Sequence, residues 1–123
     1  MTVYVQQEEL NHIPLTNDLG ADIAQGEFCV IGAWACVADE AVASLASGSF
    51  DVREGIGVQS SDLVSGEDTF GTEGQEVFWS AADNAFSDTE TAGYYLVGYL
   101  TETKDSDGVI VFEKLRHAVL ITT

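Results

Sequence analysis

The sequence predicts an all-β domain: a small barrel or sandwich-like arrangement of short antiparallel strands, with at most one short helix and an extended N-terminal arm. Two observations predict this class. Short runs of β-branched and aromatic residues recur along the 123 residues and are separated by segments rich in Gly, Ser, Asp and Thr. No segment shows the apolar period of a helix of three turns. Many short strands with frequent turns are typical of barrels and sandwiches.

Residues 1–25 are predicted to form the arm, and residues 26–123 the β-rich domain. The first segment is mixed and polar, and Pro14 keeps the residue before it out of a helical conformation. Val3, Tyr4 and Val5 are β-type residues suited to a short strand. We expect this strand to pack on another surface rather than in the core of the domain.

Two apolar runs with the spacing of a hairpin follow the start of the domain. Phe28–Ile31 and Trp34–Ala38 are separated by a Gly-Ala pair, which predicts a tight hairpin or a bulge. The next segment, 39–45, is ambiguous. Asp39 is suited to cap a short helix there, and the same residues also fit a loop and a strand.

The two cysteines, Cys29 and Cys36, lie in these apolar runs, and we expect two buried thiols. A disulfide is geometrically feasible if they face each other on paired strands, but synthesis in a cytoplasm disfavours it. Zinc is not expected, because His12 and His117 are distant from the cysteines in sequence and no usual ligand spacing is present.

Residues 50–59 alternate between larger residues and small or polar ones, which predicts a half-buried strand. The longest polar stretch follows at 60–74 and predicts a surface loop. Its lone aromatic residue, Phe70, fits two interpretations. The ring is either part of the core or an exposed anchor for a partner.

Four further strands and a short return run are predicted in the second half of the chain. Their expected ranges are Gln75–Trp79, Ala85–Ser87, Tyr94–Thr101, Val109–Leu115 and 117–123. Trp34 and Trp79 lie within strand-like runs, so we expect both rings to pack in the core, with Trp79 mostly buried.

Acidic residues dominate the charge of the chain. Four basic residues face 21 acidic ones, for a formal net charge of −17. A body this acidic repels phosphate groups and anionic lipid, so we expect no binding to nucleic acid or to a membrane surface. No apolar run approaches the roughly 20 residues of a membrane helix, and the N-terminus lacks the pattern of a secretory signal. Synthesis in a cytoplasm is expected.

No pattern of catalytic or cofactor-binding residues stands out. His12 and His117 have no neighbouring Ser or Cys at a spacing that nominates a nucleophile. Residues 105–108 resemble the opening of a calcium loop but lack its later ligands, so a turn is expected there. We therefore expect a protein that is not an enzyme and that has no cofactor and no metal site.

The order of these runs resembles the pattern of the bacteriophage head-decoration, or capsid cement, proteins over about residues 24–115. That pattern places a Gly-x-x-Val-Tyr/Phe-Trp segment between a series of short strands and a closing Val-x-Val-x-Leu. The matching segments here are Gly26 with Phe28–Ile31, Ala35–Ala38, Phe50–Val58, Gly74–Trp79, Leu96–Tyr99 and Val109–Leu115. The chain departs from the pattern in its long 60–74 loop and in Phe78, where the family has tyrosine.

The resemblance implies a structural protein of the virion without catalytic residues. Such a protein is commonly a homotrimer on the outer capsid surface, where it clamps neighbouring subunits of the major capsid protein against the pressure of packaged DNA. Under this hypothesis the chain is made in the host cytoplasm and joins the capsid. We expect the contacts with the capsid or with a neighbouring copy to involve Val3, Tyr4, Val5 and Phe70.

A second hypothesis from another class stays open. A small β-sandwich module on a virion surface would bind a carbohydrate or a receptor through exposed aromatic and acidic side chains. Binding to a glycan array without affinity for capsids would favour this alternative.

Overall fold

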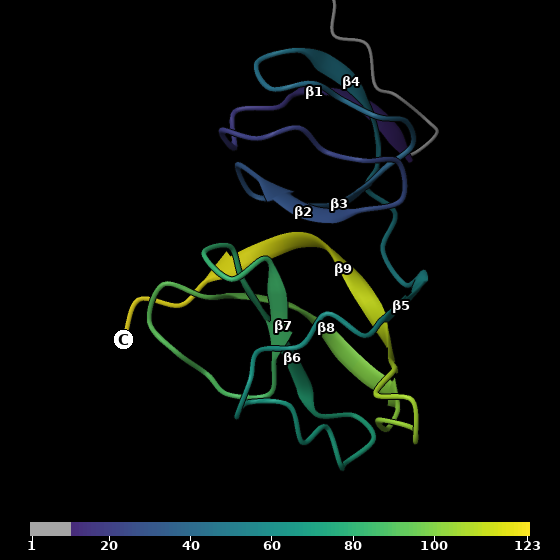
Figure 1. Cartoon of the computed structure of the whole chain (residues 1–123), viewed down its shortest axis with the longest axis vertical. Coiled ribbons are helices and arrows are strands. Elements are labelled where there is room, and N and C mark those ends of the chain that lie inside the picture. Colours follow the sequence, from purple (N-terminus) through teal and green to yellow (C-terminus); the bar gives the residue numbers. More distant parts are fainter. Residues whose placement is uncertain (1–10) are drawn as a thin grey trace, which may run out of the picture.

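A computed structural model of the protein describes residues 11–123, which form nine antiparallel β-strands and no helix (Figure 1). The predicted all-β class is confirmed, but the sheet does not close into a barrel. No helix that could span a membrane occurs within this range. The strands are β1 (His12–Thr16), β2 (Phe28–Ile31), β3 (Trp34–Ala38), β4 (Ser47–Asp51), β5 (Gly57–Ser60), β6 (Glu76–Ser80), β7 (Ala85–Ser87), β8 (Tyr95–Glu102) and β9 (Ile110–Leu120).

The strands form two halves that meet at β9. The main order is β1-β4-β3-β9-β8-β6-β7, with β2 added to β3 and β5 added to β9. Figure 1 shows β1–β4 as one layer and β5–β9 as the other. The halves are joined in the sheet by a single register pair between β3 and β9, Trp34 with His117. We call β1–β4 the first half and β5–β9 the second half.

The β2–β3 hairpin lies between two hydrophobic cores and contributes to both. Side chains alternate between the faces of a strand. Phe28 and Val30 therefore pack into the core of the second half, whereas Cys29 and Ile31 pack into the core of the first half. All four residues of β2 are buried. This double burial explains why the run is continuously apolar instead of alternating.

Aromatic rings fill the core of the second half. Phe28 lies edge-on to Trp79 at a centroid distance of 4.9 Å, and Phe86 contacts both rings and Phe112 at 4.7–5.0 Å. Trp79 is only 4% exposed, as predicted. Trp34 is half-buried instead, with its ring tilted against His117 at 4.6 Å.

The expected arm boundary at residue 25 differs from the structure. Residues 12–16 form β1, which pairs with β4 along its whole length. Ile13 and Leu15 pack against the core of the first half, and Ile23 is buried in it. Pro14 is tolerated because β1 is the last strand of the sheet order, where a missing N–H donor costs little. Residues 12–25 therefore belong to the folded body.

The strand predicted over 50–59 is divided in two. β4 ends at Asp51 and β5 begins at Gly57, and the chain crosses between the halves in the interval. Gly55 makes this crossing with a φ of 82°, and its N–H donates to the Lys114 carbonyl. The ambiguous segment 39–45 contains no helix; Val42 forms a bridge with Ile23.

Leu45 occupies a turn position that glycine fills elsewhere in this chain. Among residues 11–123, five turns close with a hydrogen bond from the fourth residue to the first, and their third residue has a φ of 68–93°. These third residues are Gly26, Leu45, Gly66, Gly74 and Gly93. The left-handed conformation costs a residue with a Cβ about 1–2 kcal/mol. Leu45 is 79% exposed, so burial of its side chain does not offset that cost.

We expect Leu45→Gly to raise the free energy of unfolding by about 0.5–1 kcal/mol, because glycine removes the strain but adds some freedom to the unfolded chain. Urea unfolding followed by tryptophan fluorescence measures the change. Leu45→Ala is the matched control. It keeps the Cβ and should leave stability nearly unchanged, and equal effects of the two variants would rule out strain as the cause.

Candidate functional site

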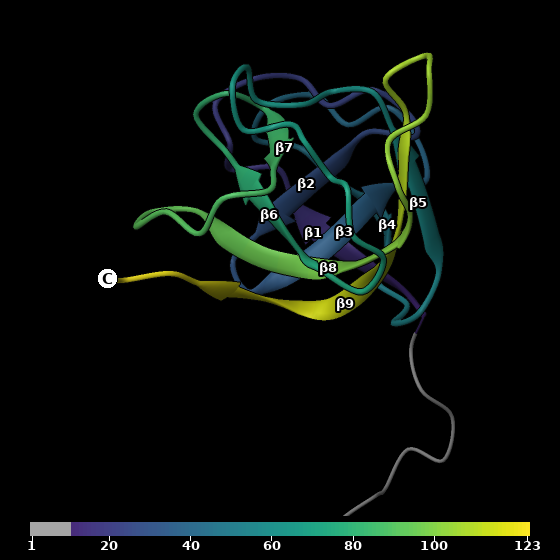
Figure 2. The same ribbon diagram turned by 90° about the horizontal axis from the view of Figure 1, so that it is seen from below.

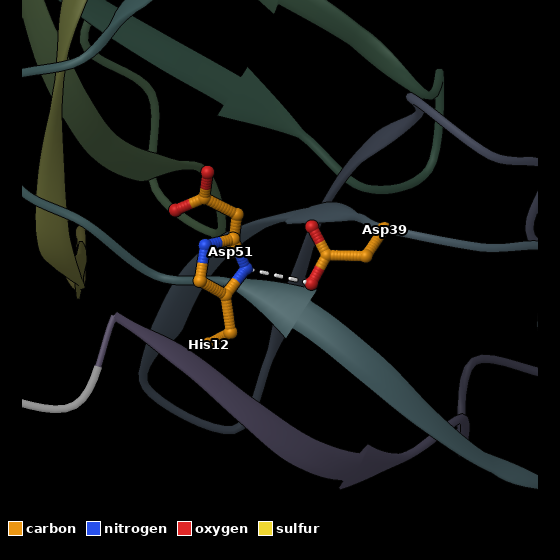
Figure 3. Close-up of side chains that lie close together, drawn as sticks. All are labelled: His12, Asp39 and Asp51. Carbon is orange, nitrogen blue, oxygen red and sulfur yellow. Dashed lines mark hydrogen bonds and ion pairs between the residues drawn. The ribbon is translucent and has the colours of Figure 1, made fainter.

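Three polar side chains meet beside β1: His12 from β1, Asp39 from the bend after β3, and Asp51 from the end of β4. Figure 3 shows the His12 ring next to the carboxylates of Asp39 and Asp51. His12 Nδ1 lies 2.8 Å from Asp39 Oδ2, which also accepts a hydrogen bond from the Ser49 hydroxyl at 2.7 Å. Asp51 lies opposite His12 in the β1–β4 register, and one ligand atom of each of the three lies within 4.8 Å of the others.

The buried member of this group, Asp51, is already paired with a cation. The Arg53 guanidinium donates to both carboxylate oxygens at 2.6–3.1 Å. Burial raises the pKa of Asp51, but the hydrogen bonds and charge of Arg53 outweigh this effect and hold that pKa below its ordinary value. A guanidinium in this position opposes a divalent cation. We therefore interpret the group as a polar clasp that ties β1 to β3 and β4, and not as a metal centre.

Lys114 is a second link between the two halves of the fold. Its side chain is 1% exposed, and Nζ donates to the Ala35 carbonyl of β3 at 2.7 Å and to the Leu115 carbonyl at 2.9 Å. Burial lowers the pKa of Lys114 to about 8. An ammonium enclosed in this way is held by backbone carbonyls and is not presented to a substrate.

The two cysteines face each other across the β2–β3 hairpin. Cys29 and Cys36 are register partners, and both are buried free thiols with Sγ atoms 3.5 Å apart. The hydrogen bond with Cys36 and burial raise the pKa of the Cys29 thiol far above its ordinary value. The prediction of two buried thiols is confirmed, and neither thiol has the character of a reactive nucleophile.

Two neighbouring hollows, each of about 340 Å³, open beside the β6–β7 turn. Both are lined by Glu27, Trp79 and Asn84. The aromatic residues at the first hollow, including Trp79, are almost completely buried. A sugar ring stacks on an open aromatic face, so this geometry gives little support to a carbohydrate site.

The predicted contact residues have different outcomes. Val3, Tyr4 and Val5 lie outside the described residues. Phe70 is fully buried in the core of the second half with a φ of 42°, so its ring is not an exposed anchor. The physical reason is that the polar 60–74 loop packs its few apolar side chains inward: Leu63 packs against the same core, and Phe70 is the loop's one aromatic residue.

The exposed apolar side chains were not indicated by the sequence pattern. Among residues 11–123, the large apolar residues that face solvent are Leu19, Leu45, Tyr99, Val119 and Leu120. Leu19 and Leu45 lie near each other, because the Leu45 and Leu19 amides both donate to Asn17. Val119 and Leu120 lie at the end of β9. Exposed apolar side chains in clusters mark candidate contact surfaces.

Comparison with known families identifies the chain. Residues 5–115 match the family model described as phage cement protein. The chain belongs to the phage cement protein family. No curated protein and no solved structure gives a significant match.

Membership in this family makes the cement protein a structural component of a phage capsid that contributes to capsid stability. The polar clasp, the lysine link and the paired thiols fit that role, since each holds parts of the fold together. The family also indicates a partner class, the capsid proteins.

Proposed function

We propose that this cement protein decorates the outer surface of a phage capsid and clamps neighbouring subunits of the major capsid protein, as a homotrimer. The observation that carries the proposal is the family match over residues 5–115. The charge supports the outer surface in particular. A chain with a net charge of −17 is repelled by packaged DNA, so the interior face of the shell is the less favourable location.

The segment before β1 supplies a contact with the capsid or with a neighbouring copy in this proposal. Val3, Tyr4 and Val5 are β-type residues that are suited to add a strand to an exposed sheet edge. Strand addition needs no apolar pocket, because main-chain hydrogen bonds supply much of the affinity. Phe70 is not part of the contact, since its ring lies in the core.

Deleting residues 2–10 should leave a folded protein that binds capsids at least tenfold more weakly. The deletion stops before β1, because β1 begins at His12 and is part of the sheet. Binding is measured by cosedimentation with undecorated capsids, and folding by the urea midpoint. A triple serine variant at positions 3–5 is the matched control for segment length. Unchanged capsid binding by both variants would rule out a role for this segment.

Cryo-electron microscopy of decorated capsids tests the trimer. We expect three copies around each occupied position on the outer surface. Isolated single copies on the capsid would contradict the trimer, whereas a monomer in dilute solution would not, because assembly can be coupled to docking. The alternative of a carbohydrate-binding or receptor-binding module predicts retention on glycans without capsid affinity.

A further inference from the structure

The end of β9 is paired on one side only. Toward β8, pairing continues to Tyr95 with Leu120, and Ile121 then exchanges hydrogen bonds with Tyr94 and Gly93. On the opposite side, β9 pairs with β5 only as far as Glu113 and with β3 at His117. The Ala118 N–H donates to the Ala33 carbonyl and is the last such bond on that side within residues 11–123.

The backbone of Leu120 therefore points to the open side. Residues along an antiparallel strand alternate between pairing with one neighbour and with the other. Ile121 bonds to the β8 side and Ala118 to the β3 side. By this alternation, Leu120 and then Thr122 direct their N–H and C=O groups away from β8. We call residues 118–122 the open edge.

Two neighbouring side chains of the open edge are exposed as well. Val119 is 51% exposed and Leu120 is 50% exposed, although successive residues face opposite sides of a strand. The run Ala118-Val119-Leu120-Ile121-Thr122 contains no charge and no proline. Natural proteins protect sheet edges with charge, proline or cover, because a bare apolar edge recruits another strand.

We propose that the open edge of one copy receives Val3, Tyr4 and Val5 of a neighbouring copy as an added β-strand. This inference rests on the proposed function, in which copies assemble together on the capsid. In an added strand, successive side chains would face opposite sides of the sheet, as they do in β9. Val3 and Val5 would then lie on one face and Tyr4 on the other.

The positions of the two ends favour a neighbouring copy over the same chain. In both views, the start of β1 and the C-terminal end of the chain lie on opposite sides of the molecule (Figures 1 and 2). Val5 lies six residues before Asn11, and a fully extended segment of that length reaches at most about 20 Å. A head-to-tail contact of this kind forms a closed ring when the rotation between copies permits, as a trimer requires.

Charge also favours this location for a contact between copies. Residues 1–103 contain a single basic residue, Arg53, against 18 acidic ones. The segment 104–123 is balanced, with three basic and three acidic residues, and it places Arg116 on β9. Two copies that each carry a net charge of −17 therefore meet least repulsion where one of them presents this balanced segment.

The test is a complementation experiment with two defective variants. Leu120→Pro removes the outward N–H of the open edge without removing a hydrogen bond to β8. Deleting residues 2–6 removes the donor and keeps the open edge. Sedimentation analysis across protein concentration should show self-association of the full chain, weakened at least tenfold in each variant alone. An equimolar mixture should form a dimer, in which the intact arm fills the intact edge, and nothing larger.

Controls separate the edge from the fold and from the capsid contact. Leu120→Ala keeps the N–H and should associate nearly as the full chain does. Thr122→Pro removes the next outward N–H, beyond the end of β9, and should also weaken association. Weakening by Leu120→Pro alone would mean that this variant acts by perturbing the fold. A full chain that stays monomeric at the highest concentration, or a mixture that forms no dimer, overturns the inference. If both variants associate normally and only the deletion loses capsid binding, the arm contacts the capsid, and the proposed function stands while this inference fails.

Discussion

Gly98→Ala should destabilise this cement protein by about 3 kcal/mol or more, the largest effect expected of any single methyl group added to it. Gly98 lies in β8 opposite Lys114, at an irregularity of the β8–β9 pairing. A Cβ at this position would overlap the Glu113 carbonyl oxygen and lie 2.6 Å from Phe112 Cδ2. Since one of these obstacles is backbone, relief requires the two central strands to separate.

The measurement for this variant is the urea midpoint and the melting temperature relative to the parent chain. A small domain has a free energy of unfolding of only about 5–15 kcal/mol, so the loss should clearly lower both the urea midpoint and the melting temperature. Gly57→Ala is the matched control, because Gly57 also pairs with β9 and its added Cβ would meet only Val111 at an ordinary 3.8 Å. Comparable losses in both variants would show that backbone overlap is not the cause.

The second large effect is a pH dependence of stability that comes from Lys114. Burial lowers the pKa of Lys114 to about 8 in the folded protein, against about 10.5 in an exposed lysine. Between these two values the unfolded chain binds more protons than the folded one, so the free energy of unfolding rises with pH. The free-energy cost of enclosing the ammonium is fully present below pH 8 and is relieved by pH 10.5. The upper limit of this cost is on the order of 3 kcal/mol.

Urea unfolding between pH 7 and pH 11 measures this rise, with Lys114→Met as the comparison. Contributions that are common to both proteins cancel, so the difference between the two curves isolates Lys114. We expect the parent chain to gain stability relative to the variant across pH 8–10.5. Parallel curves would mean that the ammonium is solvated in the folded state. Asp51, Arg53 and Arg116 also act on this group and should shift the window without changing its direction.

The features that could be predicted from the sequence are the ones encoded locally. The apolar runs around the Gly-Ala pair gave the β2–β3 hairpin, and the burial of Trp79 followed from its place inside a strand. The buried thiols were also predictable, because both cysteines lie in those runs. Each of these inferences needs only neighbours within a few residues.

The features that could not be predicted depend on partners distant in the chain. Ile13 and Leu15 look isolated among polar residues until β4 lies beside them. The polar clasp joins His12 to Asp39 across 27 positions, and no local spacing indicates it. Phe70 is fully buried although it belongs to a loop whose composition is typical of a protein surface. The open edge is likewise a property of the topology, since it depends on where β3 stops pairing with β9.

The β2–β3 hairpin has a consequence for how the molecule comes apart. The hairpin supplies side chains to both cores. If one half unfolded, the hairpin face that packs against that half would become exposed to water, at a cost in free energy. We therefore expect the halves to unfold in a single cooperative transition, although their sheets are joined by only one register pair. Under the proposed clamping function, a load applied to either half would be borne by the stability of the whole chain.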